Sequence, residues 1–210
     1  KKTGDWTEWY SNGNQRARGT LPTGLWTTWH RDGHKESEGH QLDGEEDGAW
    51  QYWGSNGHIK AEGEWSKGKR HGHWTHWFVN GNKKREANWE QGKEHGSWAE
   101  WFPSGQRKQE GEWGVGKEHG TWAYWHANGQ KARDGCWDQG HEEGMWTSWF
   151  DTGTLEREYE YQAGKFHGKR RLYRKDGTIE SEGTYVEGLR HGTWQAFHEN
   201  GRLRSEAEVV

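Results

Sequence analysis

A period of 24 residues dominates this sequence. The motif Gly-x-Trp-x-x-Trp recurs as tryptophan pairs, the first two being Trp6 with Trp9 and Trp26 with Trp29. From Trp26 onward every step is 24 residues, whereas the first step is 20 residues and is shortened near Pro22. Self-similarity at a fixed period predicts a repeat architecture in which each unit packs against its neighbours.

The period predicts that residues 1–210 form a single array of eight full units and a ninth that ends after its second strand. The units start near regularly spaced glycines, which are Gly4, Gly24, Gly48, Gly72, Gly96, Gly120, Gly144, Gly168 and Gly192. Four further columns repeat in most units: a turn pair ending in glycine, an acidic residue, a second aromatic residue and a histidine before glycine. In the third unit these columns are Asn56-Gly57, Glu62, Trp65 and His71.

Tryptophan takes the place that aliphatic residues hold in an ordinary core. Leucine, isoleucine, valine and phenylalanine together supply only 19 of the 210 residues, and tryptophan alone supplies 19. Each indole ring can bury roughly 150–250 Å², so we expect an aromatic core rather than a disordered chain. The 33 glycines are spread evenly and exclude a helical bundle, because each would cost a helix about 1 kcal/mol.

Each unit is predicted to form a β-hairpin. Asn-Gly between two short aromatic runs is typical of a type I′ turn, so Asn56-Gly57 is expected to be a two-residue loop. This loop pairs Ser55 with His58, Trp53 with Lys60, Gln51 with Glu62, and Trp50 with Gly63. A large ring can lie over a strand glycine, which favours the last of these pairs. Ser104 and Thr152 fit the turn less well, and a bulged loop would instead shift the register by one residue.

This register places a mainly apolar set of side chains on one face and a mainly charged set, with one tryptophan, on the other. One face carries Trp50, Tyr52, Ile59, Gly63 and Trp65, and the other carries Gln51, Trp53, Lys60, Glu62 and Glu64. Residues 66–72 are expected to form a polar second loop at the other rim of the sheet. The predicted fold is therefore all-β: an elongated array of about nine 24-residue hairpins in one twisted antiparallel meander sheet, advancing about 10 Å per repeat.

The consensus resembles a known repeat family. The pattern Asn-Gly…Glu-Gly-x-Trp-x-x-Gly-Lys-x-x-Gly-x-Trp-x-x-Trp, as in residues 56–77 and 128–149, is similar to MORN repeats. It is most similar to the bacterial variant found in YwqK-family antitoxins. The resemblance implies a hairpin-repeat sheet that acts as a binding scaffold, and the antitoxin label implies a toxin as partner. This chain is richer in tryptophan than such repeats, and its seventh and eighth units depart furthest from its own consensus.

Two columns are candidates for binding a partner. The first is the aromatic row Trp29, Trp53, Trp77, Trp101, Trp125 and Trp149, continued by Tyr173 and Phe197, and the second is the acidic column that includes Glu62, Glu86 and Glu110. A single-layer sheet cannot bury both faces, so one tryptophan row is expected to be partly open and to mark an interaction surface. Alternatively, Lys60, Lys84 and Lys108 cover these rings, and the acidic residues form ladder contacts with neighbouring side chains.

Other site classes find little support in the sequence. The histidine column is expected to cap turns rather than bind metal, because histidines of adjacent repeats lie about 10 Å apart and zinc ligands lie about 2.0–2.1 Å from the ion. Almost every polar residue belongs to a repeated column, whereas a catalytic site needs unlike groups at one place. We therefore expect no enzyme activity, no metal and no cofactor. Balanced charge and the lack of a long apolar run indicate neither nucleic-acid binding nor a membrane span.

Three functions are compatible with this reading. The first is a scaffold that binds another protein through an aromatic sheet face, with a toxin as one such partner. The second is a glycan-binding module of the cell envelope, in which exposed tryptophans stack on sugar rings. The third is a structural spacer, or a scaffold that assembles with itself through open sheet edges. The sequence leaves the compartment open between the bacterial cytoplasm and the cell envelope.

Overall fold

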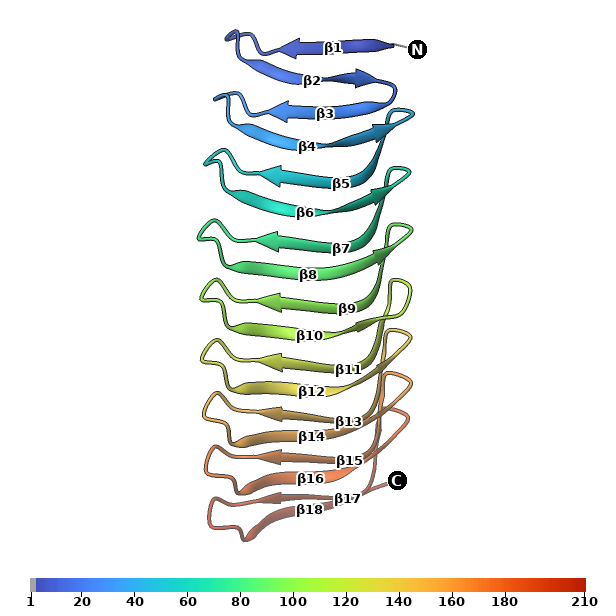
Figure 1. Ribbon diagram of the computed structural model, residues 1–210. Coiled ribbons are helices and arrows are strands. Elements are labelled where there is room, and N and C mark those ends of the chain that lie inside the picture. The colour runs from blue at the N-terminus through green and yellow to red at the C-terminus, as the bar shows by residue number, and fades with distance from the viewer. Residues whose placement is uncertain (1–2) are drawn as a thin grey trace. The chain divides into compact units, whose positions relative to one another are not determined.

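The structure, a computed structural model, describes residues 3–210 and confirms the all-β prediction. Every regular element in that range is a β-strand, and the strands follow one another as an antiparallel meander of hairpins (Figure 1). Contacts divide the chain into two compact units, Lys1–Gly105 and Gln106–Val210. Within each unit, every strand pairs with the next strand along the chain.

The strands keep the period of the sequence. Unit 1 contains β1 (Gly4–Trp9), β2 (Gln15–Leu21), β3 (Gly24–Trp29), β4 (Lys35–Leu42), β5 (Glu45–Trp53), β6 (Ile59–Ser66), β7 (Lys69–Trp77), β8 (Lys83–Glu90) and β9 (Lys93–Trp101). Unit 2 contains β10 (Arg107–Trp113), β11 (Glu118–Trp125), β12 (Lys131–Asp138), β13 (His141–Trp149), β14 (Leu155–Gln162), β15 (Lys165–Tyr173), β16 (Ile179–Val186), β17 (Leu189–Phe197) and β18 (Leu203–Val209).

The Asn-Gly loops are bulged, so the predicted type I′ turn is wrong. In the third repeat the N–H of Gly57 donates to the carbonyl of Gly54 at 2.9 Å, and Gly57 has a φ of 76°. Asn56 keeps a negative φ, because its side-chain oxygen accepts the N–H of His58 at 3.1 Å and stabilises a turn that needs only one left-handed residue. Trp53 consequently pairs with Ile59 rather than with Lys60. The predicted pairs Trp50–Gly63 and Gln51–Glu62 are confirmed.

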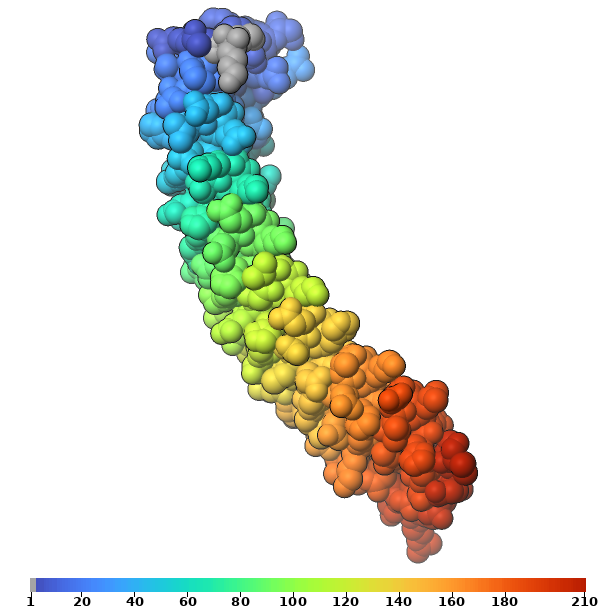
Figure 2. All heavy atoms as spheres, turned by 90° about the vertical axis from the view of Figure 1, so that its right-hand side faces the viewer, coloured from blue at the N-terminus to red at the C-terminus, as the bar shows by residue number. Residues whose placement is uncertain are grey.

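The second loops are the true two-residue turns, and the long polar loop expected over residues 66–72 is wrong. Lys67 and Gly68 have φ values of 51° and 71°, and β7 begins directly after them at Lys69. The N–H of Gly68 donates to the carbonyl of Glu46 in the preceding repeat at 2.9 Å, which holds this turn against its neighbour. In each unit these turns lie along one edge of the sheet. Figure 2 looks onto this edge, and its colours follow the order of the chain within each unit.

The core face confirms the predicted aromatic stripe but shows a different covering of the glycines. The ring of Trp50 lies against Gly39 of the preceding repeat, and its indole N–H donates to the carbonyl of His40 at 2.9 Å. A Cβ added to Gly39 would lie 2.2 Å from that ring, so the contact requires glycine. Trp74 covers Gly63 in the same way. Each ring therefore crosses to the repeat before it and joins two neighbours.

Flat rings and charged side chains together bury this single layer. In unit 1, Trp74 stacks between Tyr52 and His76 with ring centroids 6.0 Å away on each side, and it is only 1% exposed. The guanidinium of Arg70 lies 4.4 Å from its ring centroid and shields it from solvent. In unit 2, Arg133 lies 3.9 Å from the ring of Trp146. Cation–π stacking thus replaces the second layer that normally covers a sheet.

Candidate binding face

The acidic column lies on the face opposite the core, which we call the acidic face. Glu62 pairs with Gln51 of its own repeat and with Thr75 of the next, so each carboxylate stands between two residues of one repeated column. The column continues through Glu38 and Glu86 in unit 1. In unit 2 it contains Glu110, Asp134, Glu158, Glu182 and Glu206.

Short-range contacts hold these carboxylates in place, as the ladder alternative predicts. Lys35 donates to Glu38 at 2.8 Å, and this bond lowers the pKa of the Glu38 carboxyl although partial burial opposes the shift. Thr27 donates to the same carboxylate at 3.1 Å. In the next repeat, Gln51 donates to Glu62 at 3.3 Å. The acidic column is therefore ordered by its own neighbours.

The predicted aromatic row lies beside this column. The ammonium group of Lys35 contacts Glu38 and also lies 5.1 Å from the ring centroid of Trp53 in the following repeat. In the eighth repeat the hydroxyl of Tyr173, which occupies the same slot as Trp53, donates to Glu158 at 2.7 Å. The aromatic row and the acidic column therefore share one face.

The cations on this row differ from those expected. Lys83 lies 5.7 Å from the ring of Trp101, and Lys131 lies 5.4 Å from the ring of Trp149. The prediction named the next column, Lys60, Lys84 and Lys108, but Lys84 lies over Phe78 at 5.8 Å instead. The bulge after each Asn-Gly turn explains this shift of one residue, because it changes which strand residue lies beside the ring.

All the predicted site residues are half-buried. This holds for Trp29, Trp53, Trp77, Trp101, Trp125 and Trp149, and for Glu62, Glu86 and Glu110. Trp9 of the first repeat is the open member of the row, with 63% of its surface exposed. The row is thus partly accessible, and much of each ring rests on neighbouring side chains.

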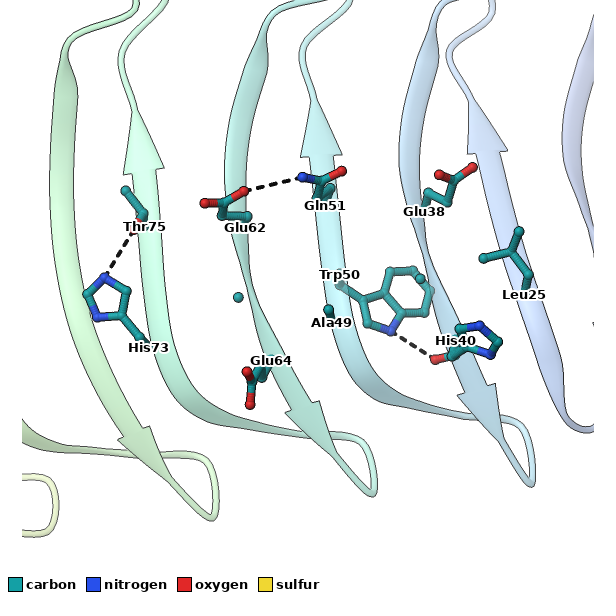
Figure 3. A pocket seen from close by; sticks show the side chains of 12 residues that line it. Leu25, Glu38, His40, Ala49, Trp50, Gln51, Glu62, Glu64, His73 and Thr75 are labelled. Carbon is teal, nitrogen blue, oxygen red and sulfur yellow. Dashed lines mark hydrogen bonds between the residues drawn. The ribbon is translucent and has the colours of Figure 1, made fainter.

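A hollow of about 370 Å³ opens on the acidic face of unit 1 (Figure 3). It lies across β3 to β7, where Gln51 stands between Glu38 and Glu62, and the short side chain of Ala49 lies beside Gln51 on the same strand. Leu25 and His73 complete its walls, and His73 contacts the Thr75 hydroxyl at 3.2 Å. The sequence prediction missed these lining residues. Their signal was position alone, because Leu25 and His73 directly precede Trp26 and Trp74 and so point to the face opposite these rings.

The prediction that the histidine column caps turns is wrong. His71 lies inside β7 and pairs with Glu64, because the second loop is shorter than expected. His119 lies 3.4 Å from Asp138. Within residues 3–210, no three histidine, cysteine or acidic side chains are grouped so that they could hold a metal ion. The same part of the chain contains no helix long and apolar enough to cross a membrane.

Comparison with known families matches part of unit 2. The model of the MORN repeat variant matches residues 142–163, 166–187 and 190–210. Three repeats of unit 2 are MORN repeat variants. A search of curated proteins finds no significant match to the chain.

The three MORN repeat variants share their strand pairing with the tryptophan-rich repeats. Trp146 pairs with Tyr159, and Trp50 pairs with Gly63, at the same place in their hairpins. What differs is composition, since the matched segments carry Tyr161 and Tyr185 where earlier repeats carry tryptophan. The geometry of the MORN repeat variant therefore also appears in repeats outside the matched segments.

Proposed function

We propose that this chain is a non-catalytic repeat scaffold that binds another protein through its acidic face. The observation that carries this proposal is the half-buried aromatic row that runs beside the ordered carboxylates on the side opposite the core. Tryptophan is enriched in binding hot spots, and carboxylates with fixed positions can select complementary charge. A repeated carboxylate column would repel a phosphate backbone, which favours protein over nucleic acid.

A bulky charge placed in the hollow tests this function without touching the core. Ala49 and Gln51 are exposed and line the hollow, so the variant A49R/Q51R should block the acidic face and leave the fold unchanged. In affinity capture with the full chain, quantified by mass spectrometry, we expect specific partners to fall at least tenfold. Leu42→Arg, at the exposed last residue of β4 and outside the hollow, is the matched control and should retain them. Equal capture by all three proteins would contradict the proposal.

Within this function, the resemblance to YwqK-family antitoxins makes a toxin the first partner to examine. Co-production of this chain with a candidate toxin should restore growth, and A49R/Q51R should fail to restore it. Restoration by the blocked variant would place toxin binding elsewhere on the chain.

Glycan binding has weaker support. Lysine ammonium groups lie over the rings of Trp53, Trp101 and Trp149, where a sugar ring would stack. Titration with peptidoglycan fragments and β-glucan oligosaccharides, followed by intrinsic fluorescence, should leave the tryptophan emission unchanged. A saturable change would favour the glycan function over the protein function.

A further inference from the structure

One column of the first loops is interrupted in the third repeat. The residue that follows the outer aromatic slot has a large side chain in eight repeats, as Tyr10, His30, Phe78, Phe102, His126, Phe150, Arg174 and His198. In the third repeat this position is Gly54. The interruption therefore removes a whole side chain from an otherwise regular rim.

In other repeats this side chain joins two neighbours. The hydroxyl of Tyr10 donates to the carbonyl of Trp29 in the following repeat at 2.9 Å. The Nε2 of His30 lies 3.0 Å from the carbonyl of Trp53, which fixes Nε2 as the protonated nitrogen. Tyr10, His30 and His126 thus supply an aromatic donor to the carbonyl of the next outer aromatic residue, and Arg174 supplies a guanidinium. The three phenylalanines of the column fill the same place without a donor.

At Gly54 no side chain fills the corresponding space, and the side-chain oxygen of Asn56 lies 2.8 Å from where a Cβ would stand. A hollow of about 230 Å³ lies there, with walls from Ile59, Trp77, Phe78 and Val79. Val79 is 81% exposed at its mouth. Among the described residues, 3–210, no side chain donates to the carbonyl of Trp77, which is the equivalent of the Trp29 carbonyl. The gap therefore keeps the aromatic walls and the acceptor of the filled repeats.

The surroundings of this gap are basic. Lys60, Lys84 and His58 line it, and none of its lining residues is acidic. A group that enters this space would meet apolar walls inside and positive charge at the edge. An aromatic side chain with carboxylates beside it matches both properties.

We propose that the gap at Gly54 binds a tyrosine side chain of a partner protein, presented in an acidic segment. The ring fills the space that Tyr10 fills in the first repeat, and its hydroxyl donates to the carbonyl of Trp77. Lys60 and Lys84 pair with the flanking carboxylates. This inference rests on the proposed function as a protein-binding scaffold, but its site is at the first-loop end of the aromatic row and shares no residue with the hollow of Figure 3.

Labelled peptides test the site on the intact chain. Fluorescein-labelled Asp-Glu-Tyr-Glu-Asp should bind at least tenfold tighter than Asp-Glu-Ala-Glu-Asp in fluorescence anisotropy. Gly54→Tyr should weaken the tyrosine peptide at least tenfold and raise the melting temperature, because the chain then fills its own gap. Gly54→Ala adds only a methyl group, which displaces the side-chain oxygen of Asn56 from its 2.8 Å approach and leaves the gap unfilled, so this matched control should retain binding. Equal binding of the two peptides, or undiminished binding to Gly54→Tyr, would overturn the inference.

A second variant separates charge from shape. The double variant K60E/K84E leaves the aromatic walls in place and should weaken the acidic tyrosine peptide at least fivefold. No change in affinity would contradict the assigned role of the lysines. These results are independent of A49R/Q51R, which alters a hollow that shares no residue with the gap, so failure at Gly54 leaves the test of that hollow intact.

Discussion

The fourth and eighth repeats solve the same packing problem with different residues. In unit 1, the ring of Trp74 covers Gly63 and donates to the carbonyl of Glu64 at 2.9 Å. In unit 2, Arg170 occupies the tryptophan slot and pairs with Tyr159, which occupies the glycine slot. An arginine cannot cover bare backbone as an indole does, so the ring has moved to the opposite strand. Compared with the fourth repeat, both positions therefore differ: arginine stands in place of tryptophan, and tyrosine stands in place of glycine.

The exchange also alters the layer above the sheet. In unit 1 the guanidinium of Arg70 covers Trp74, whereas in unit 2 the equivalent position is Phe166. The ring of Phe166 lies 5.1 Å from Tyr159, 4.7 Å from Tyr161 and 5.2 Å from Tyr185. The comparison teaches that the fold requires one ring for each strand pair and a cover above it, while the strand that supplies the ring can change.

The largest expected effect is the loss of the unit 1 ring. Trp74→Ala removes a fully buried indole and uncovers Gly63, which should lower the free energy of unfolding by about 3–5 kcal/mol. Arg170→Ala should cost about 1 kcal/mol, because its side chain is only half-buried. Urea unfolding followed by far-ultraviolet circular dichroism measures both. Similar losses at the two positions would contradict the claim that the slot of Trp74 carries the packing in unit 1 and that of Arg170 does not in unit 2.

The coupled exchange can be tested in a double-mutant cycle. Tyr159→Gly removes a ring and Arg170→Trp inserts one against Tyr159, so each single variant should be destabilised. The double variant recreates the tryptophan-over-glycine pair and should recover about 1–2 kcal/mol relative to the sum of the single variants. Additive losses in the same unfolding assay would show that the two positions are independent.

The two units should also differ in their response to acid. Burial, with repulsion from Arg85, lowers the pKa of His76 to about 4, below its usual value near 6.5. Between these values the unfolded chain binds a proton that the folded chain does not, so stability falls as the pH drops from about 6.5 to about 4. His76→Tyr copies the residue in the slots of Tyr52 and Tyr124 and should flatten this dependence in urea unfolding. An unchanged slope in the variant would exclude His76 as its source.

The smallest expected effect concerns the two-residue second loops, whose first residue is left-handed in both units. Val115 is a β-branched residue with a φ of 47°, and Ala163 has a φ of 50° in the equivalent turn. Val115→Asn should stabilise the chain by about 0.5–1 kcal/mol, because asparagine tolerates the left-handed region. Ala163→Asn should gain less, since alanine has no branched Cβ. A loss of stability in Val115→Asn would mean that the valine side chain stabilises this turn.

The sequence was informative where the period fixed geometry directly. The burial of the core tryptophans follows from alternation in a strand and could be predicted. The pairing of Trp50 with Gly63 was also correct, because the register shift between Tyr52 and Trp53 restores the pairing that a two-residue loop would give. The turns could not, because Asn56-Gly57 suits both a type I′ turn and a bulged loop. Lys67 gives no sign that it enters the left-handed region, which it does with support from the preceding repeat.

In the candidate site, too, some features could be predicted from the sequence and others could not. The face that carries Glu62 and Trp53 was predicted correctly, since residue parity along a strand decides it. The lysine that covers Trp53 was not, because the bulge selects Lys35 over its neighbouring column. The gap at Gly54 was visible in the sequence as a missing side chain, but its meaning required the contacts of Tyr10 and His30.

Hydrogen exchange of the indole N–H groups, followed by nuclear magnetic resonance, tests the central packing claim most directly. The N–H groups of Trp50, Trp74 and Trp146 donate to carbonyls of the preceding repeat and are buried, whereas Trp9 is 63% exposed. The account predicts that the three buried groups exchange at least about a hundredfold more slowly than that of Trp9. Exchange at one common rate for all four would contradict the claim that each core ring is fixed across the boundary between repeats.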